Sequence, residues 1–234
     1  MADSISNKRP SESDQALEGE GPAKKQKTGA PTFSDVKSMV HLIVGPENYA
    51  ETFTVHKEVV CHYSPFLAKA FDDVATYQKR STNPRALKLL IQWLYSQNIT
   101  VKQLEGEWKS NASNADEDEA LVELWILAKD WEIPALQNKT LKAIDDIYKK
   151  CKLCPCLCIP AAFRATLPGS PLRQYLVSLY VRCNDPSRTF YSNDPSHSGL
   201  PRDFLPEVIN YLGKKLQHAQ EIHDVSDFFQ QVEQ

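Results

Sequence analysis

The sequence predicts an α+β fold, in which a small sheet formed by a hairpin is covered by a cluster of helices. Two observations carry this prediction. Residues 39–45 form an apolar run, residues 52–55 alternate polar with apolar side chains, and Gly45 and Pro46 break the chain between them, as expected for a hairpin. Most apolar residues further along recur at helical spacing. Because a lone hairpin is barely stable in water, we expect the helices to cover it.

The composition is that of an ordinary soluble domain with appendages. The chain has 234 residues, of which 41% are hydrophobic and 24% charged, and its net charge is -3. This charge gives no argument for nucleic-acid binding. No window approaches the roughly 18 consecutive apolar residues of a membrane span, and the first residues lack the apolar core of a secretory signal. We therefore expect an intracellular protein, with no membrane partner, whose six cysteines are reduced thiols.

Residues 1–32 are predicted to be a disordered tail. They contain no aromatic residue and are rich in Ser, Glu, Gly, Pro and Lys, so they bury too little apolar area to offset chain entropy. Two basic clusters, one of Lys8 and Arg9 and one of Lys24, Lys25 and Lys27, suggest a bipartite nuclear-import signal. The tail also has five acidic residues, so a solvated polyampholyte is the alternative. Nucleus and cytoplasm are both open.

After the hairpin we expect four helices. Residues 56–62 should form a short one. Ser64 and Pro65 have the form of an N-cap and a first helical residue, and Asn83-Pro84 repeats this signal. The apolar stripes are Phe66, Leu67, Ala70 and Phe71 for the second helix, and Ala86, Leu87, Leu90, Ile91, Trp93 and Leu94 for the third. An exposed loop that ends in an acidic helix start is expected over 109–119, and the helix should continue to the break at Ile133-Pro134.

The helix after Pro134 carries Leu141, Ile144 and Tyr148 on one side, so it should pack antiparallel to the helix before it. Further on, Gly169-Ser170-Pro171 precedes a helix that contains Leu172, Tyr175, Leu176 and Leu179. Residues 184–201 read as a long loop. A last amphipathic helix contains Leu205, Val208, Ile209, Leu212 and Leu216, and Phe228 and Phe229 suggest a short terminal one.

The stretch from Phe33 to Tyr95 resembles a BTB/POZ domain of the fungal stand-alone type. The resemblance rests on Ser34-Asp35-Val36, the apolar strand ending at Gly45, Phe53-x-Val55-His56-Lys57, Ser64-Pro65-Phe66 and the helix from Leu89 to Tyr95. It implies an interaction domain over 33–150 without catalytic apparatus, followed by a helical extension over 151–234. It also implies structural roles for eight residues: Asp35, His56, Lys57, Ser64, Pro65, Phe66, Trp93 and Tyr95.

The chain departs from this family between residues 72 and 82. Family members have a longer segment there, with an acidic, Thr-rich strand that completes the sheet, whereas this chain has eleven mostly polar residues. We expect either a lost strand or coding sequence skipped in the gene model. The sheet should then be two-stranded or irregular.

Cys151, Cys154, Cys156 and Cys158 form a cysteine run beside Lys149, Lys150 and Lys152, whose charge should lower the thiol pKa values. Four thiolates suit zinc, but this spacing lacks the second, distant ligand pair of structural zinc sites. The alternatives are a buried cysteine-rich turn, which we prefer, and a redox pair. We predict no metal and no cofactor.

The leading functional hypothesis is a non-enzymatic protein–protein interaction module, with other proteins or a weak homodimer as partners. No phosphate loop, Gly-x-Ser-x-Gly or His-Glu-x-x-His motif is present. The alternative is a substrate adaptor of a cullin-type ubiquitin ligase, although no convincing hydrophobic-x-acidic motif occurs between Phe71 and Asn83. A zinc or redox protein ranks last.

Overall fold

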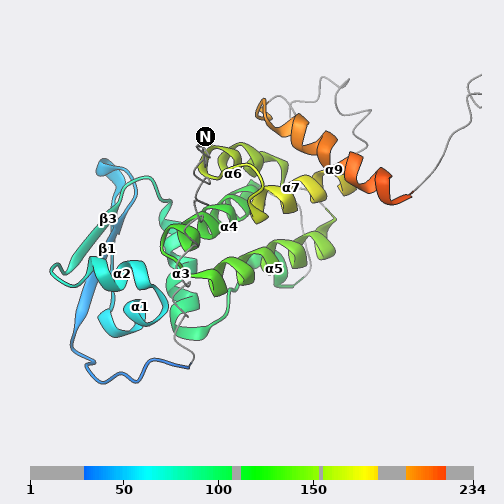
Figure 1. Ribbon diagram of the computed structural model, residues 1–234. Coiled ribbons are helices and arrows are strands. Elements are labelled where there is room, and N and C mark those ends of the chain that lie inside the picture. Colours follow the sequence, from blue (N-terminus) through cyan, green and yellow to red (C-terminus); the bar gives the residue numbers. More distant parts are fainter. Residues whose placement is uncertain (1–28, 107–111, 153–154, 184–198, 220–234) are drawn as a thin grey trace, which may run out of the picture.

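The computed structural model describes residues 29–106, 112–152, 155–183 and 199–219. Within these ranges a small sheet lies at one end of the molecule and a layer of helices extends from it to the helix α9 at the other end (Figure 1). Residues 1–28 of the predicted disordered tail, which contain both basic clusters, lie outside the described residues. The terminal piece around Phe228 also lies outside them.

The sheet has three strands in the order β2-β1-β3. Strand β1 (Met39–Val44) pairs antiparallel with β2 (Glu51–His56), which confirms the hairpin. Val40, Leu42 and Val44 of β1 are buried, because alternate residues of a strand face the same side. Gly45 turns the chain with φ +90°, and a Cβ atom there would lie 3.0 Å from the carbonyl oxygen of Tyr49.

Strand β3 (Thr76–Lys79) corrects the prediction that residues 72–82 contain no strand. It pairs in parallel with β1, from His41 opposite Thr76 to Val44 opposite Lys79. Four residues suffice because Tyr77 anchors the strand: its ring makes edge contacts with Phe66 at 5.7 Å and with Trp131 at 5.9 Å. The sheet is therefore neither two-stranded nor irregular, and its third strand is short and lies at the edge.

Two of the three helices that follow the hairpin start where their predicted caps lie. Helix α1 (Lys57–Tyr63) ends at Ser64, which caps α2 (Pro65–Ala70) by accepting a hydrogen bond from the backbone nitrogen of Leu67 at 3.0 Å. Asn83 caps α3 (Pro84–Ser96) in the same way through the nitrogen of Arg85, at 2.9 Å. The apolar face of α3 is buried as predicted, with Ile91 at its half-buried margin.

Helices α4 (Ala112–Asp130) and α5 (Pro134–Cys151) are the predicted closing pair and pack side by side. The loop expected ahead of the acidic helix start is shorter than predicted, because α4 already begins at Ala112. The acidic run is held within the helix: the Glu117 carboxylate accepts hydrogen bonds from the backbone nitrogens of Lys102 (2.8 Å) and Gln103 (2.9 Å) in the short 3-10 turn η2 (Lys102–Leu104). This contact stabilises both elements.

The C-terminal extension consists, in its described part, of the turn η3 (Cys156–Cys158) and the helices α6 (Ile159–Ala165), α7 (Pro171–Cys183) and α9 (Phe204–Ala219). Arg173 of α7 ties these three helices together. Its guanidinium is buried and lies over the Phe163 ring, 4.2 Å from the centroid. It donates to the carbonyl oxygens of Phe163 and Thr166 and to the carboxylates of Asp203 (2.7 Å) and Glu207 (3.0 Å).

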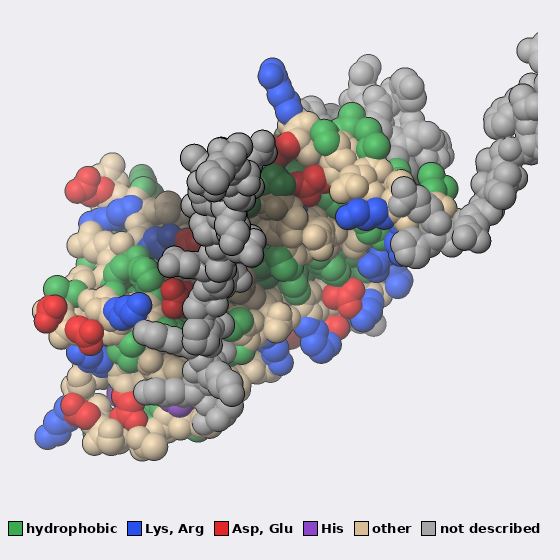
Figure 2. Space-filling model, viewed as in Figure 1, with side chains coloured by type: hydrophobic (Ala, Val, Ile, Leu, Met, Phe, Trp, Pro, Cys, Tyr) green, Lys and Arg blue, Asp and Glu red, His purple; other side chains and the backbone are tan. Residues whose placement is uncertain are grey.

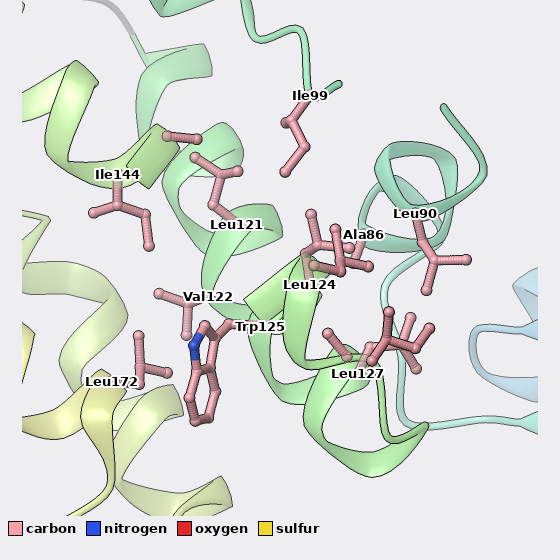
Figure 3. Packing of buried hydrophobic residues seen from close by; sticks show 14 of the residues in the cluster. Ala86, Leu90, Ile99, Leu121, Val122, Leu124, Trp125, Leu127, Ile144 and Leu172 are labelled. Atoms are coloured by element: carbon pink, nitrogen blue, oxygen red, sulfur yellow. The ribbon is translucent and has the colours of Figure 1, made fainter. Parts of the chain in front are cut away.

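Helix α4 is the centre of the hydrophobic core (Figure 3). Leu124 faces α3, where Leu90 lies, whereas Trp125 points to the opposite side, toward Leu172 of α7. All four side chains are buried. The sheet-bearing half and the extension therefore share one helix as their common wall. Among the described helices, none has both the length and the apolar character that crossing a bilayer requires.

Candidate interaction surface

Residues 29–38, which we call the strap, run along α1 before the first strand begins. The Glu58 carboxylate of α1 holds the strap by accepting hydrogen bonds from the Thr32 hydroxyl (2.6 Å), the Ser34 hydroxyl (3.1 Å) and the backbone nitrogen of Asp35 (3.3 Å). These bonds, above all the one from Thr32, lower the pKa of Glu58 to about 2. The end of the segment that composition assigns to the tail is thus fixed against α1.

Four side chains gather where the strap meets the sheet, and we call them the strap patch: Phe33, Met39, His56 and Tyr95. The His56 ring makes edge contacts with the rings of Phe33 (5.6 Å) and Tyr95 (5.8 Å). Met39 stands opposite His56 in the β1–β2 register, so both side chains project from the same face. Phe33, Met39 and Tyr95 are 42%, 37% and 46% exposed, which makes the patch accessible to another protein.

The strap patch is held rigidly. The Tyr95 hydroxyl lies 2.8 Å from His56 Nδ1 and accepts a hydrogen bond from the His56 backbone nitrogen at 3.1 Å. Phe33 has a left-handed backbone with φ 54°, a conformation that costs a non-glycine residue roughly 1–2 kcal/mol. Such strain persists only where the surroundings fix it, and here the hydrogen bonds to Glu58 on both sides of Phe33 do so.

Sequence reasoning places His56 correctly at the strand-to-helix junction but leaves two roles open, capping and packing. In the structure the His56 side chain packs and does not cap. His56 occupies the N-cap position of α1, yet its side chain makes no cap hydrogen bond and instead contacts Tyr95. Asp35, expected to be structural, is exposed and accepts a hydrogen bond from the backbone nitrogen of Lys37 at 3.2 Å.

The other residues implied by the resemblance join or form the helices. Lys57 donates from Nζ to the carbonyl oxygen of Phe71 at 2.5 Å, which links α1 to the end of α2. The buried Ser64 hydroxyl donates to the carbonyl oxygen of Trp131 at 2.6 Å. Trp93 is buried against the Tyr63 ring, at 5.1 Å between centroids. Pro65 is the first residue of α2, and the half-buried Phe66 follows it.

A family model for the BTB/POZ domain matches residues 25–147, more than half of the chain. The chain belongs to the BTB/POZ family. The match begins in the tail, just before the strap, and ends within α5. The fungal stand-alone type stays a prediction.

Among solved structures, the chain is similar to the BTB domain of zebrafish PATZ1. The two are 16% identical, the alignment covers 44% of this chain and 74% of that one, and the TM-score is 0.31. No curated protein matches the chain.

The cysteine run lies just after the region matched by the BTB/POZ model. Cys151 ends α5 and Cys158 ends η3, and both are buried; Cys154 lies outside the described residues. Within the described part of the chain, no three His, Cys, Asp or Glu side chains are grouped so as to hold a metal ion.

The expected lowering of the thiol pKa values is wrong for the two buried cysteines. Burial raises the pKa of Cys151 despite the opposing charge of Lys150. Burial also raises the pKa of Cys158 far above its ordinary value, and Asp118 adds to the rise. One neighbouring lysine is already engaged, because Lys149 pairs with Asp145 at 2.5 Å. These two thiols are therefore protonated and unreactive near neutral pH.

Two carboxylates important to this BTB/POZ fold escape sequence reasoning. Glu58 looks like an ordinary acidic residue in a first helical turn, and nothing in its neighbourhood signals a partner 26 residues earlier. Asp118 lies in an acidic run that reads as solvated, yet burial raises its pKa to about 6, against the hydrogen bond that Gln103 Nε2 donates at 2.8 Å. Both roles depend on tertiary packing.

A cavity of about 410 Å³ lies where β3 and its following turn meet α4 and α6. Its walls include the ion pair between Lys79 and Asp130 (2.8 Å) and the carboxylate of Glu123. Glu123 accepts a hydrogen bond from the backbone nitrogen of Asn83 at 2.7 Å. This carboxylate therefore secures the start of α3.

Proposed function

We propose that the chain is a non-enzymatic protein–protein interaction module that binds its partners through the strap patch. The observation that carries the proposal is the exposure of Phe33, Met39 and Tyr95 around the fixed His56 ring. Aromatic residues and methionine are enriched in protein interfaces, where charged residues are depleted at the centre. The BTB/POZ family is a family of interaction domains, so the proposal concerns which surface this member uses.

The rigidity of the strap patch supports the same function. A surface that is already ordered loses little side-chain and loop freedom when a partner binds, so more of the contact energy becomes affinity. The hydrogen bonds from Tyr95 and from the strap to Glu58 supply this order before binding. The strained backbone of Phe33 is consistent with a side chain held out for contact rather than packed for stability.

The partner is another protein, and a second copy of this chain is one candidate. Adaptor function with a cullin-type ligase remains a prediction from the family resemblance. Nuclear import through Lys8, Arg9, Lys24, Lys25 and Lys27 likewise remains a prediction from sequence. Changing Lys24, Lys25 and Lys27 to Ala in a tagged protein tests it, since an unchanged nuclear signal would reject the tail as its cause.

The test compares two single substitutions of the full chain by quantitative affinity purification and mass spectrometry. Phe33→Asp places a charge at the strap patch, and Tyr49→Asp places the same charge on the 80% exposed tyrosine of the hairpin turn. We expect Phe33→Asp to deplete the specific partners at least tenfold and Tyr49→Asp to retain them. Equal retention by both variants, with circular dichroism unchanged, would overturn the proposal.

A further inference from the structure

Helix α9 has two apolar faces, and the described part of the chain covers only one of them. Phe204 and Val208 are buried, and the Phe204 ring contacts Tyr180 of α7 at 4.8 Å. Leu205, Ile209 and Leu216 are 39%, 61% and 68% exposed. Their spacing of four and seven residues places them in one line along the helix, about 100° from the buried face. We call these three residues the α9 stripe; the half-buried Leu212 lies within it.

Hydrophobic side chains lie at the surface over part of α9 (Figure 2), and the α9 stripe is a small patch. It is too small to hold two free copies of the chain together. A stable interface needs about 600 Å² from each partner, and three aliphatic side chains, each already partly covered, provide much less. A segment tethered to the helix needs far less area, because a short link raises its effective concentration to the millimolar range.

The chain itself supplies such a segment. Residues 220–234 follow directly after α9. Beyond Ile222, their apolar residues Val225, Phe228, Phe229 and Val232 fall within about 100° of a helical projection. The segment contains four acidic residues and neither Lys nor Arg. Helix α9 has Lys214 and Lys215 in the half from which the segment departs, about 160° and 100° around the helix from the stripe, so the acidic segment meets no like charge there.

The lengths also agree. The α9 stripe spans twelve residues of helix, and the eleven steps between its ends give about 17 Å at a rise of about 1.5 Å per residue. Fifteen residues allow a turn of about four residues, and the remaining eleven or so would cover the same length as a helix. The segment can therefore return along the whole stripe, with its aromatic pair opposite the middle of α9.

We propose that residues 220–234 fold back as an amphipathic helix, antiparallel to α9, and cover the α9 stripe. The apolar face of the segment contacts Leu205, Ile209 and Leu216, and its acidic residues stay in solvent. The segment thereby completes the C-terminal extension and withholds the stripe from other proteins.

Hydrogen–deuterium exchange of the full chain, read by mass spectrometry over residues 220–234, tests this arrangement. A synthetic peptide of the same fifteen residues gives the reference rate. We expect amides of the segment to exchange at least tenfold more slowly in the protein than in the peptide. Ile209→Arg should abolish this protection, whereas Asn210→Arg, the same charge on the exposed neighbour outside the stripe, should preserve it.

Exchange at the peptide rate in the unchanged protein would overturn the proposal, as would protection that survives Ile209→Arg. Should Ile209→Arg not fold, Phe229→Asp makes the same test from the segment's side. Measurements at 1 µM and 100 µM distinguish the occupants: protection independent of concentration supports the intramolecular contact. Protection lost on dilution assigns the α9 stripe to a second copy and overturns the proposal.

Discussion

Replacing Arg173 by Ala should destabilise the protein by about 3 kcal/mol. The change leaves two buried carbonyl oxygens, those of Phe163 and Thr166, without their donor, at a cost of about 1–3 kcal/mol each. Breaking a buried ion pair costs about 3–5 kcal/mol. This full cost does not apply, because the partner carboxylates of Asp203 and Glu207 are 53% and 19% exposed and regain water. The ion pairs therefore add about 1 kcal/mol to the roughly 2 kcal/mol lower bound for the two carbonyl oxygens.

The assay is urea unfolding followed by tryptophan fluorescence and circular dichroism. With an m-value of about 2–3 kcal/mol per molar for a chain of this size, the midpoint should fall by about 1 M. Arg173→Lys keeps the charge but lacks the planar guanidinium that serves several acceptors, so the midpoint of this variant should fall about half as far. The exposed Arg164 of α6 is the control, and Arg164→Ala should change stability by less than about 0.5 kcal/mol.

A midpoint for Arg173→Ala that falls no further than that of Arg164→Ala would refute the reasoning. It would show that the guanidinium network is replaced by water at no cost, and that α6, α7 and α9 are held together by apolar packing alone. A separate early transition in the circular dichroism signal, ahead of the fluorescence change, would instead show that the extension unfolds first.

Four further predictions concern stability, pH, metal content and assembly. The folded-state pKa of Asp118 is raised to about 6, so ionisation of this buried carboxyl lowers the stability of the protein as pH rises from about 4 to 6. Asp118→Asn should therefore stabilise the protein by about 1–2 kcal/mol at pH 7. In urea titrations this gain should vanish near pH 4. Ser64→Ala should cost about 1–3 kcal/mol in the same assay, because it removes a buried cap and a buried donor; a loss below 0.5 kcal/mol contradicts this. Elemental analysis of the purified protein should find no stoichiometric zinc, and one zinc per chain would overturn our preference for a plain cysteine-rich turn. Size-exclusion chromatography with light scattering should show a monomer or a weak dimer, and a tight dimer that persists on dilution would contradict this.

The features that sequence predicts correctly are those set by neighbours in the chain. Ser64 and Asn83 cap their helices because the bonds they make reach only two or three residues along the chain. The apolar periodicity around Leu90 determines which face of α3 is buried. In both cases the information lies within one helix, so no knowledge of the tertiary fold is needed.

The failures involve contacts between distant residues. Strand β3 is too short and polar to be recognised, and pairing with β1 together with the anchoring of Tyr77 makes it a strand. The role of Glu58 depends on where the strap passes. The thiols of the cysteine run are governed by burial, which outweighs the lysines beside them in sequence. The exposure of Ile209 could not be predicted from the sequence either, because an amphipathic pattern does not show how much of a wide apolar face is buried against another element.

That α4 serves both halves of the molecule has a consequence for how this chain can diverge. Exchanging the extension for an unrelated one would leave Trp125 facing a surface that no longer fits it, while Leu124 on the other side would be unaffected. Relatives with a different C-terminal architecture should therefore differ at the position of Trp125 and keep an aliphatic residue at the position of Leu124. The two faces of α4 would then have diverged independently of each other.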